Sequence, residues 1–169
     1  MKIRPEQEAE YPVIYELVKE AFASAPHADG DEQDYVNLLR SSKNYIPELA
    51  LVAEENGELI GHIMFTTTKI IGGEDSYTEL LLSPLCVLLP HRNRGIGAEL
   101  VQEGFRRAKN IGYSAAFVVG DPKYYSRFGY KVVSEFGIRN DSEIPDMYVM
   151  GCELFPGALK NKQGSIRIV

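Results

Sequence analysis

The first third of the chain carries apolar residues at helical spacing. After a short strand-like start at Ile3, apolar side chains recur every three or four residues and predict a helix over residues 10–23: Ile14, Leu17, Val18, Ala21 and Phe22. In the polar stretch that follows, from Ser24 to Asp34, Asp29 or Asp31 is a candidate cap for a second short helix. We expect this stretch to help select a substrate, because loops often border binding sites.

From residue 49 the pattern changes to the alternation that is typical of strands. Residues 49–53, 59–71 and 77–89 are predicted to form three strands, with turns over residues 55–58 and 72–75. Short turns join antiparallel neighbours, so these strands form a meander. The third strand leads directly into a basic turn that contains Gly95 and Gly97.

A second amphipathic helix is predicted after the turn. It ends at Gly112, and its apolar face holds Leu100, Val101, Phe105, Ala108 and Ile111. Residues 115–119 are uninterruptedly apolar, which is typical of a strand buried on both faces and reached through a helical crossover. One βαβ unit is therefore expected inside a mostly antiparallel sheet.

The last third contains a capped short helix and further strands. Asp121-Pro122 starts a helix that reaches Arg127, because aspartate caps well and proline suits the first helical position. Strands are predicted near residues 130–133, 147–154 and 165–169. The fold class is thus α/β (α+β), with a mixed sheet and flanking helices. We expect one domain over residues 1–169, with a core over residues 1–155 and a tail, 156–169, of unassigned role.

Composition excludes several classes of protein. The 169 residues are 44% hydrophobic and 25% charged, which fits one soluble globular domain. The formal net charge of −6 argues against a nucleic-acid partner, because such proteins bind phosphates with basic surfaces. The same acidic balance favours a small cationic substrate.

Cysteine usage and hydropathy bear on location. Cys86 and Cys152 lie far apart in apolar runs without metal-ligand spacing, so we expect buried free thiols and no metal. No apolar stretch approaches the roughly 18 residues of a membrane helix, and residues 1–5 carry no signal segment. We therefore expect a cytoplasmic protein without a membrane partner.

The basic turn after the third strand has the features of a phosphate-binding loop. Gly95 and Gly97 allow the backbone to approach a ligand, and the next helix presents unpaired amides and its positive dipole end. A pyrophosphate is the first ligand to consider, although glycine pairs also occur in turns without ligands. A dinucleotide fingerprint would need a third glycine at Leu100, and an NTPase loop would need Gly-Lys-Ser/Thr.

Three motifs in sequence order narrow the ligand. They are Leu85-Cys86-Val87 before the turn, Arg92-x-x-Gly95-x-Gly97-Ala98 within it, and Tyr125-Ser126-Arg127-Phe128-Gly129-Tyr130 one strand later. Together they resemble the GNAT superfamily of acetyl-CoA-dependent N-acyltransferases, whose signature is Gln/Arg-x-x-Gly-x-Gly/Ala followed by Tyr-x-x-x-Gly-Phe. The predicted order of elements from Ile3 to Leu154 is similar to that family's sheet. Residues 120–130 more narrowly resemble a bacterial subgroup of predicted acetyltransferases.

The resemblance implies a set of cofactor-binding residues. Acetyl-CoA would be the cosubstrate, and its pyrophosphate would lie on the turn, at Arg92, Asn93, Arg94, Gly95, Ile96, Gly97 and Ala98. Leu85, Cys86 and Val87 would offer backbone groups to the pantetheine arm and the thioester. Two departures affect the turn's surroundings: the family's usual proline is displaced to Pro90, and the asparagine before the tyrosine helix is absent.

Tyr125 stands at the tyrosine position of the family's motif, with Tyr124 beside it. The resemblance implies that its hydroxyl reaches the coenzyme sulfur as the thiolate leaves. Reference pKa values of about 10 for tyrosine and 8.5 for a thiol make full proton transfer uphill by roughly 2 kcal/mol, so hydrogen bonding with eventual protonation is the expected role. A packed aromatic ring and an acyl-enzyme on Cys86 are the alternatives, and no histidine stands near Cys86 in sequence to activate that thiol.

An amine acceptor must also lose a proton, because a lysine-like amine is almost fully charged at neutral pH. Glu79 on the third strand is the candidate base, with Asp121, Glu32 and His27 as alternatives. Any of these carboxylates can equally be a solvated surface charge. His62 and His91 are interpreted as ordinary strand and loop residues.

The function expected from the resemblance is direct acetyl transfer from acetyl-CoA to a primary amine in a ternary complex, without a metal. The acceptor, a small molecule or a peptide, is unassigned, and a homodimer is left open. An inactive coenzyme-A-binding sensor or interaction module is the alternative, and a nucleotide-binding domain is a third reading.

Overall fold

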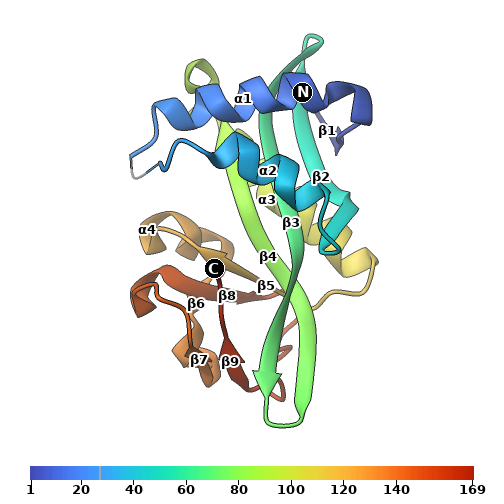
Figure 1. Cartoon of the computed structure of the whole chain (residues 1–169). Helices are drawn as coiled ribbons and strands as arrows, with labels where there is room; N and C mark the ends of the chain where they lie inside the picture. The colour runs from blue at the N-terminus through green and yellow to red at the C-terminus, as the bar shows by residue number, and fades with distance from the viewer. Residues whose placement is uncertain (27) are drawn as a thin grey trace. The chain divides into compact units, whose positions relative to one another are not determined.

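The computed structural model describes residues 1–26 and 28–169 (Figure 1). These residues form two compact units. The first unit contains residues 1–66 and 83–107, and the second contains residues 67–82 and 108–169. Strands β3 (Glu58–Gly72) and β4 (Asp75–Val87) and helix α3 (Ile96–Asn110) belong to both. Across the described residues, no helix is long and apolar enough to cross a membrane. The single domain expected over residues 1–169 stays a prediction.

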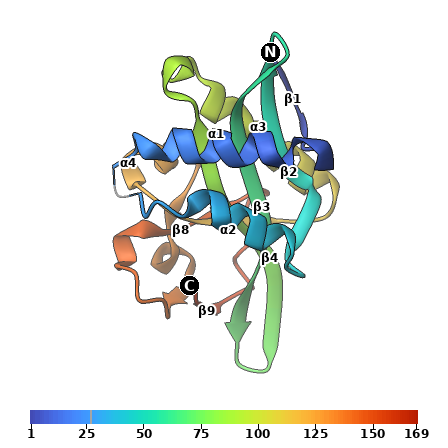
Figure 2. The ribbon, with the colours of Figure 1, turned by 45° about the horizontal axis from the view of Figure 1, so that its top comes forward.

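In the first unit, two helices cover one face of an antiparallel sheet. Strand β2 (Tyr45–Glu55) pairs with β1 (Lys2–Pro5) on one side and with β3 on the other. A short 3-10 turn, Glu8–Glu10, leads into α1 (Tyr11–Ala23), which packs with α2 (Glu32–Arg40) across β2 and β3 (Figure 2). Their buried side chains form a core with residues of the sheet: Ile14, Leu17, Val18, Val36, Ala50, Val52 and Met64.

Helix α3 covers the opposite face of the first unit. Gly61 and Phe65 on β3 contact α3, whereas Met64 belongs to the core under α1 and α2. This arrangement follows from the alternation of side chains along a strand. Gly104 of α3 lies so close to the Phe65 ring that a Cβ there would overlap the ring. A glycine at this position therefore lets helix and sheet approach closely.

A buried carboxylate ties α2 to the strands. Glu6, whose side chain is 0% exposed, accepts hydrogen bonds from Arg40 Nε at 2.7 Å, Tyr45 Oη at 2.8 Å and His62 Nε2 at 2.9 Å. Burial alone would raise the pKa of Glu6, but the hydrogen bonds from Arg40 and His62 outweigh it and lower the pKa to about 2. The ionised carboxylate therefore joins the end of α2 to two strands.

The second unit contains the parallel pair of the sheet. Three pairs, from Leu80–Ala116 to Leu82–Val118, join β4 to β5 (Ala115–Val119). Strand β5 pairs antiparallel with β8 (Val149–Glu153), which pairs with β6 (Lys131–Val132). Strand β9 (Gly164–Ile166) pairs antiparallel with β3 and parallel with β7 (Ile138–Asn140). The predicted fold class is confirmed: a mixed, mostly antiparallel sheet with one helical crossover and flanking helices.

Several predicted boundaries are wrong. Strand β2 begins at Tyr45 rather than at residue 49, and β4 ends at Val87 because residues 89–91 form a 3-10 turn. Residues 133–136 form another 3-10 turn, which cuts the strand predicted over 130–133 to two residues. The terminal strand covers residues 164–166 rather than 165–169. Strand β7 was not predicted, because three residues are too few to establish an alternation.

The caps and cysteines give mixed outcomes. Helix α2 begins at Glu32, but the Asp31 side chain makes no capping bond; instead the Glu32 carboxylate accepts from the amides of Asp29 and Gly30. Asp121 does cap α4 (Pro122–Tyr125), accepting from the Lys123 amide at 2.9 Å. Both cysteines are buried and free, as predicted.

Candidate functional site

The turn between β4 and α3 has two left-handed residues. The backbone φ is 64° at Asn93 and 79° at Gly95, and α3 begins at the next residue, Ile96. The Glu99 amide donates to the Gly95 carbonyl at 3.0 Å, so the amides before it in the first helical turn have no intrahelical acceptor. Amides at this end of a helix, together with the positive end of its dipole, suit an anionic group.

Arg92 braces the turn from within the protein. Its Nε donates to the Val87 carbonyl at 2.9 Å, and its Nη2 donates to the Ala21 carbonyl at 2.6 Å. The side chain thereby links the end of β4 to the last turn of α1. Its guanidinium adds positive charge beside the turn, but its hydrogen bonds hold the protein backbone in place.

Arg94 is also engaged, at the surface. Its guanidinium forms two hydrogen bonds to the Glu55 carboxylate, at 2.7 and 3.1 Å, and a third to His91 Nδ1 at 2.9 Å. The Arg94 side chain is 46% exposed, so this ion pair lies in water. Both arginines predicted at the rim thus have protein partners, and the backbone is the part of the turn that stays open to a ligand.

The strand that precedes the turn places Leu85, Cys86 and Val87 at the end of β4, five residues or fewer beyond the last parallel pair at Leu82. Burial raises the pKa of the Cys86 thiol to about 12, although the His62 backbone amide and Arg92 oppose the shift. His62 is therefore a neighbour of Cys86 in space, although 24 residues separate them in sequence. Its imidazole donates a hydrogen bond to Glu6 and not to the Cys86 thiol. A thiol in this state is a poor nucleophile, which favours the core-thiol interpretation.

Tyr125 lies at the end of α4, in the second unit. Its ring packs over Gly120, where a Cβ would overlap it, and meets the rings of Tyr124 and Tyr130 edge-on at 5.1 and 5.6 Å. Burial raises the pKa of Tyr125 well above its ordinary value. Among the described residues, the structure records no hydrogen-bond partner for its hydroxyl. Tyr125 is therefore a neutral hydroxyl with a proton to donate.

Glu79 is held by four donors in the second unit. Its carboxylate accepts from the Ser114 amide, the Ser114 hydroxyl, the Ala115 amide and Lys162 Nζ, at 2.6–3.1 Å. The side chain is 1% exposed. Both carboxylate oxygens therefore already accept hydrogen bonds from the protein, and the side chain is closed to solvent. The contacts therefore favour a structural role over the predicted role of base.

The other base candidates are also engaged or undescribed. Asp121 caps α4, and Glu32 binds two backbone amides. His27 lies outside the described residues. Ligand atoms of Asp29, Asp31 and Glu32 lie within 4.8 Å of one another, but the Glu32 oxygens already accept these amides, so the cluster carries no metal assignment.

Sequence reasoning missed two buried charge clusters. Glu6 and Arg40 are 34 residues apart, and Glu79 and Lys162 are 83 residues apart. The local sequence does not indicate either pair, because each charged residue taken alone resembles an ordinary surface charge. The one available hint was the position of Glu6 directly after a strand and before a helix.

Comparisons with known proteins identify the family of this chain. The family model described as acetyltransferase (GNAT) domain matches residues 2–133. The chain is 31% identical to the uncharacterized N-acetyltransferase YhbS of Escherichia coli, over 82% of this chain and 78% of YhbS. It is 33% identical to the uncharacterized N-acetyltransferase YjhQ of E. coli over 59% of this chain, which spans only 55% of the length of YjhQ.

Solved structures give the same result for the whole fold. The crystal structure of E. coli YhbS in complex with CoA matches 99% of this chain and 89% of its own, with a TM-score of 0.86 and 28% identity. A GNAT family acetyltransferase from Brucella melitensis in complex with acetyl-CoA matches 99% of this chain and 95% of its own, with a TM-score of 0.79 and 27% identity. The chain therefore belongs to the GNAT family of N-acetyltransferases.

Proposed function

We propose that this protein transfers the acetyl group of acetyl-CoA directly to a primary amine in a ternary complex. The observation that carries the proposal is the turn at residues 93–98, with left-handed backbone at Asn93 and Gly95 and open amides at the start of α3. We assign the pyrophosphate to these amides, and the pantetheine arm and thioester to the backbone at residues 85–87. The CoA and acetyl-CoA complexes of the two similar structures support this choice of cosubstrate.

Chemistry then requires an attack, a leaving group and two proton movements. The neutral amine attacks the thioester carbonyl carbon, the C–S bond breaks, and the ammonium formed gives up one proton. We assign Tyr125 to the leaving thiolate, because its hydroxyl is protonated and has no partner recorded among the described residues. An amide aimed at the developing oxyanion can contribute on the order of 3 kcal/mol.

The proton that the attacking amine loses also needs an acceptor. The Glu79 carboxylate was our sequence-based candidate, but its four donors make it a weak one. We propose that water carries this proton away.

Two experiments test the proposal. Thermal unfolding is measured with acetyl-CoA, ATP or NAD; acetyl-CoA alone should raise the melting temperature, because a ligand stabilises the state it binds. A panel of primary amines is then assayed for thiol release from acetyl-CoA. Protection by ATP or NAD without protection by acetyl-CoA would indicate a nucleotide-binding domain. Acetyl-CoA binding without transfer to any amine would indicate an inactive coenzyme-A-binding module.

A further inference from the structure

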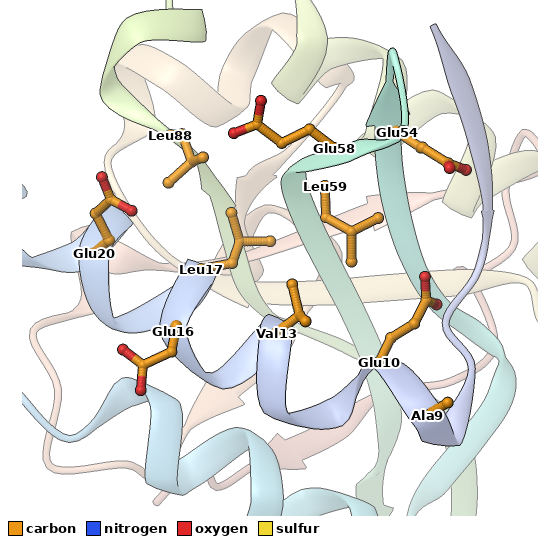
Figure 3. A pocket seen from close by; sticks show the side chains of 11 residues that line it. Ala9, Glu10, Val13, Glu16, Leu17, Glu20, Glu54, Glu58, Leu59 and Leu88 are labelled. Atoms are coloured by element: carbon orange, nitrogen blue, oxygen red, sulfur yellow. The ribbon is translucent and has the colours of Figure 1, made fainter.

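A groove with an apolar floor lies in the first unit, between α1 and the turn that joins β2 to β3 (Figure 3). Its volume is about 440 Å³, which is within the usual range for small-molecule sites. Val13 and Leu17 of α1, Leu59 of β3 and Leu88 supply the apolar surface. Val13 is 56% exposed, so part of this surface is in contact with water. The residues that we assign to acetyl-CoA are not among those that line the groove.

Carboxylates stand on both walls of this groove. Glu16 and Glu20 project from α1 and Glu10 from the 3-10 turn before it, whereas Glu54 and Glu58 project from the β2–β3 hairpin (Figure 3). In the part of the chain that the structure describes, Arg4 is the cation that pairs with them: it binds Glu10 at 2.6 Å and Glu54 at 3.0 Å.

Three of the five carboxylates have no counter-ion among the residues that the structure describes. Within residues 1–26 and 28–169, the structure records no ion pair for Glu16, Glu20 or Glu58, and all three are exposed. Glu16 and Glu20 stand four residues apart on one helix face, where like charges destabilise the helix. A cation between the two walls would relieve this repulsion.

The occupant must match both the floor and the walls. Anions are repelled by the five glutamates, and a hydrated metal ion would make no use of the apolar floor. A chain of methylene groups with an ammonium at each end offers apolar surface to Val13 and Leu17 and positive charge to Glu16, Glu20 and Glu58. We propose that this groove binds a linear aliphatic polyamine.

The assignment does not depend on acetyl transfer, so it is tested by binding alone. Spermidine should raise the melting temperature of the full chain by several degrees in low salt and should give a saturable isotherm in calorimetry. Sodium chloride at the same ionic strength and 1,5-pentanediol should do neither, because they lack either the methylene chain or the charge. An equal shift with sodium chloride or with the diol would overturn the proposal.

A matched pair of variants locates the site. Glu16→Gln with Glu20→Gln should weaken spermidine binding at least tenfold, and both changes are at exposed positions, so the variant should fold. Glu74→Gln with Glu135→Gln removes the same charge from exposed positions outside the groove and should change the affinity less than twofold. Equal weakening in both variants would mean that spermidine responds only to net charge, and would overturn the site.

A final comparison tests the occupant and the floor. Val13→Ser should weaken spermidine several-fold while leaving the melting temperature of the free protein nearly unchanged, because Val13 is largely exposed. Protection by a lysine-rich peptide without protection by spermidine would show that the groove takes a basic protein segment, and would overturn the polyamine assignment.

Discussion

The turn at residues 93–98 and the helix that carries Tyr125 offer different parts of the chain to the roles that we propose for them. In the turn, the arginine side chains bind Ala21, Val87 and Glu55, and the backbone amides are left for a ligand. At α4 the Asp121 side chain caps the backbone, and the Tyr125 hydroxyl has no hydrogen-bond partner recorded within residues 1–26 and 28–169. A site made of backbone is sensitive to added atoms, whereas a site made of one side chain is sensitive to the loss of an atom.

The largest expected effect comes from adding atoms to the turn. Gly97→Glu should weaken acetyl-CoA binding at least about 100-fold, because in our assignment a carboxylate would face the phosphates and replace charge-assisted bonds of roughly 1.5–3 kcal/mol each with repulsion. Calorimetry measures the affinity. Gln102→Glu, which adds the same charge to an exposed position further along α3, is the control and should bind normally. Equal loss in both variants would contradict the assignment of the turn.

Removing the hydroxyl oxygen of Tyr125 should lower turnover. Tyr125→Phe should lower turnover about 100-fold, the low end of the range for general acid catalysis, while acetyl-CoA affinity stays within twofold. Steady-state kinetics on an acceptor found in the amine panel measures this. Tyr124→Phe should remain active, because Tyr124 is not the motif position. Unchanged turnover in Tyr125→Phe would remove the tyrosine from the mechanism.

Acid should lower the free energy of unfolding, because it protonates the buried carboxylate of Glu6. The pKa of Glu6 falls from 4.5 unfolded to about 2 folded, so its stabilisation is present above pH 4.5 and is lost as the pH falls toward 2. The shift corresponds to about 3 kcal/mol of unfolding free energy. Glu6→Gln should therefore be less stable at pH 7 and should lose less stability on acidification. Urea unfolding from pH 7 to 2.5 compares the two, and parallel curves would contradict the prediction.

A smaller effect should follow from moving the tyrosine ring. Gly120→Ala places a methyl group against Tyr125, so the ring must shift, and turnover should fall about tenfold. The double variant with Tyr125→Phe tests whether the effect acts through the hydroxyl. If it does, adding Gly120→Ala to Tyr125→Phe should lower turnover little further, because the two changes remove the same interaction. Full additivity would point to general distortion instead.

The smallest effect should come from a charged side chain at the turn. Arg94→Ala should weaken acetyl-CoA binding no more than about threefold, because Arg94 is exposed and already paired with Glu55. Calorimetry at two salt concentrations measures this. A loss as large as that of Gly97→Glu would mean that side chains, and not the backbone, hold the cofactor.

The sequence predicted the parts of this fold that have a strong local period. Helices α1 and α3 and strand β3 appeared close to their observed bounds, because apolar spacing within each is uninterrupted. Strand β7 was not predictable, since its pairing partner β9 lies in the tail. Local pattern specifies an element, but it does not specify which distant element completes its pairing.

The candidate site was predictable to a similar degree. Gly95 marked the turn correctly, but the left-handed backbone at Asn93 was missed. Arg92 and Arg94 were predicted as rim charges, and their actual partners, Ala21 and Glu55, lie 71 and 39 residues away. Glu79 was predicted as a base because its partners Ser114 and Lys162 are 35 and 83 residues away in sequence, and the local pattern of the strand does not indicate them.

The interleaving of the two units has a consequence for synthesis on the ribosome. Glu79 emerges 83 residues before Lys162, the cation that neutralises it. Residues 67–82 likewise wait for all of residues 108–169 before their unit can close, while the first unit needs nothing beyond residue 107. The nascent chain should thus complete the turn at residues 93–98 first, and hold the distal half of the β3–β4 hairpin without its partner strands β5 and β9 until those are synthesised.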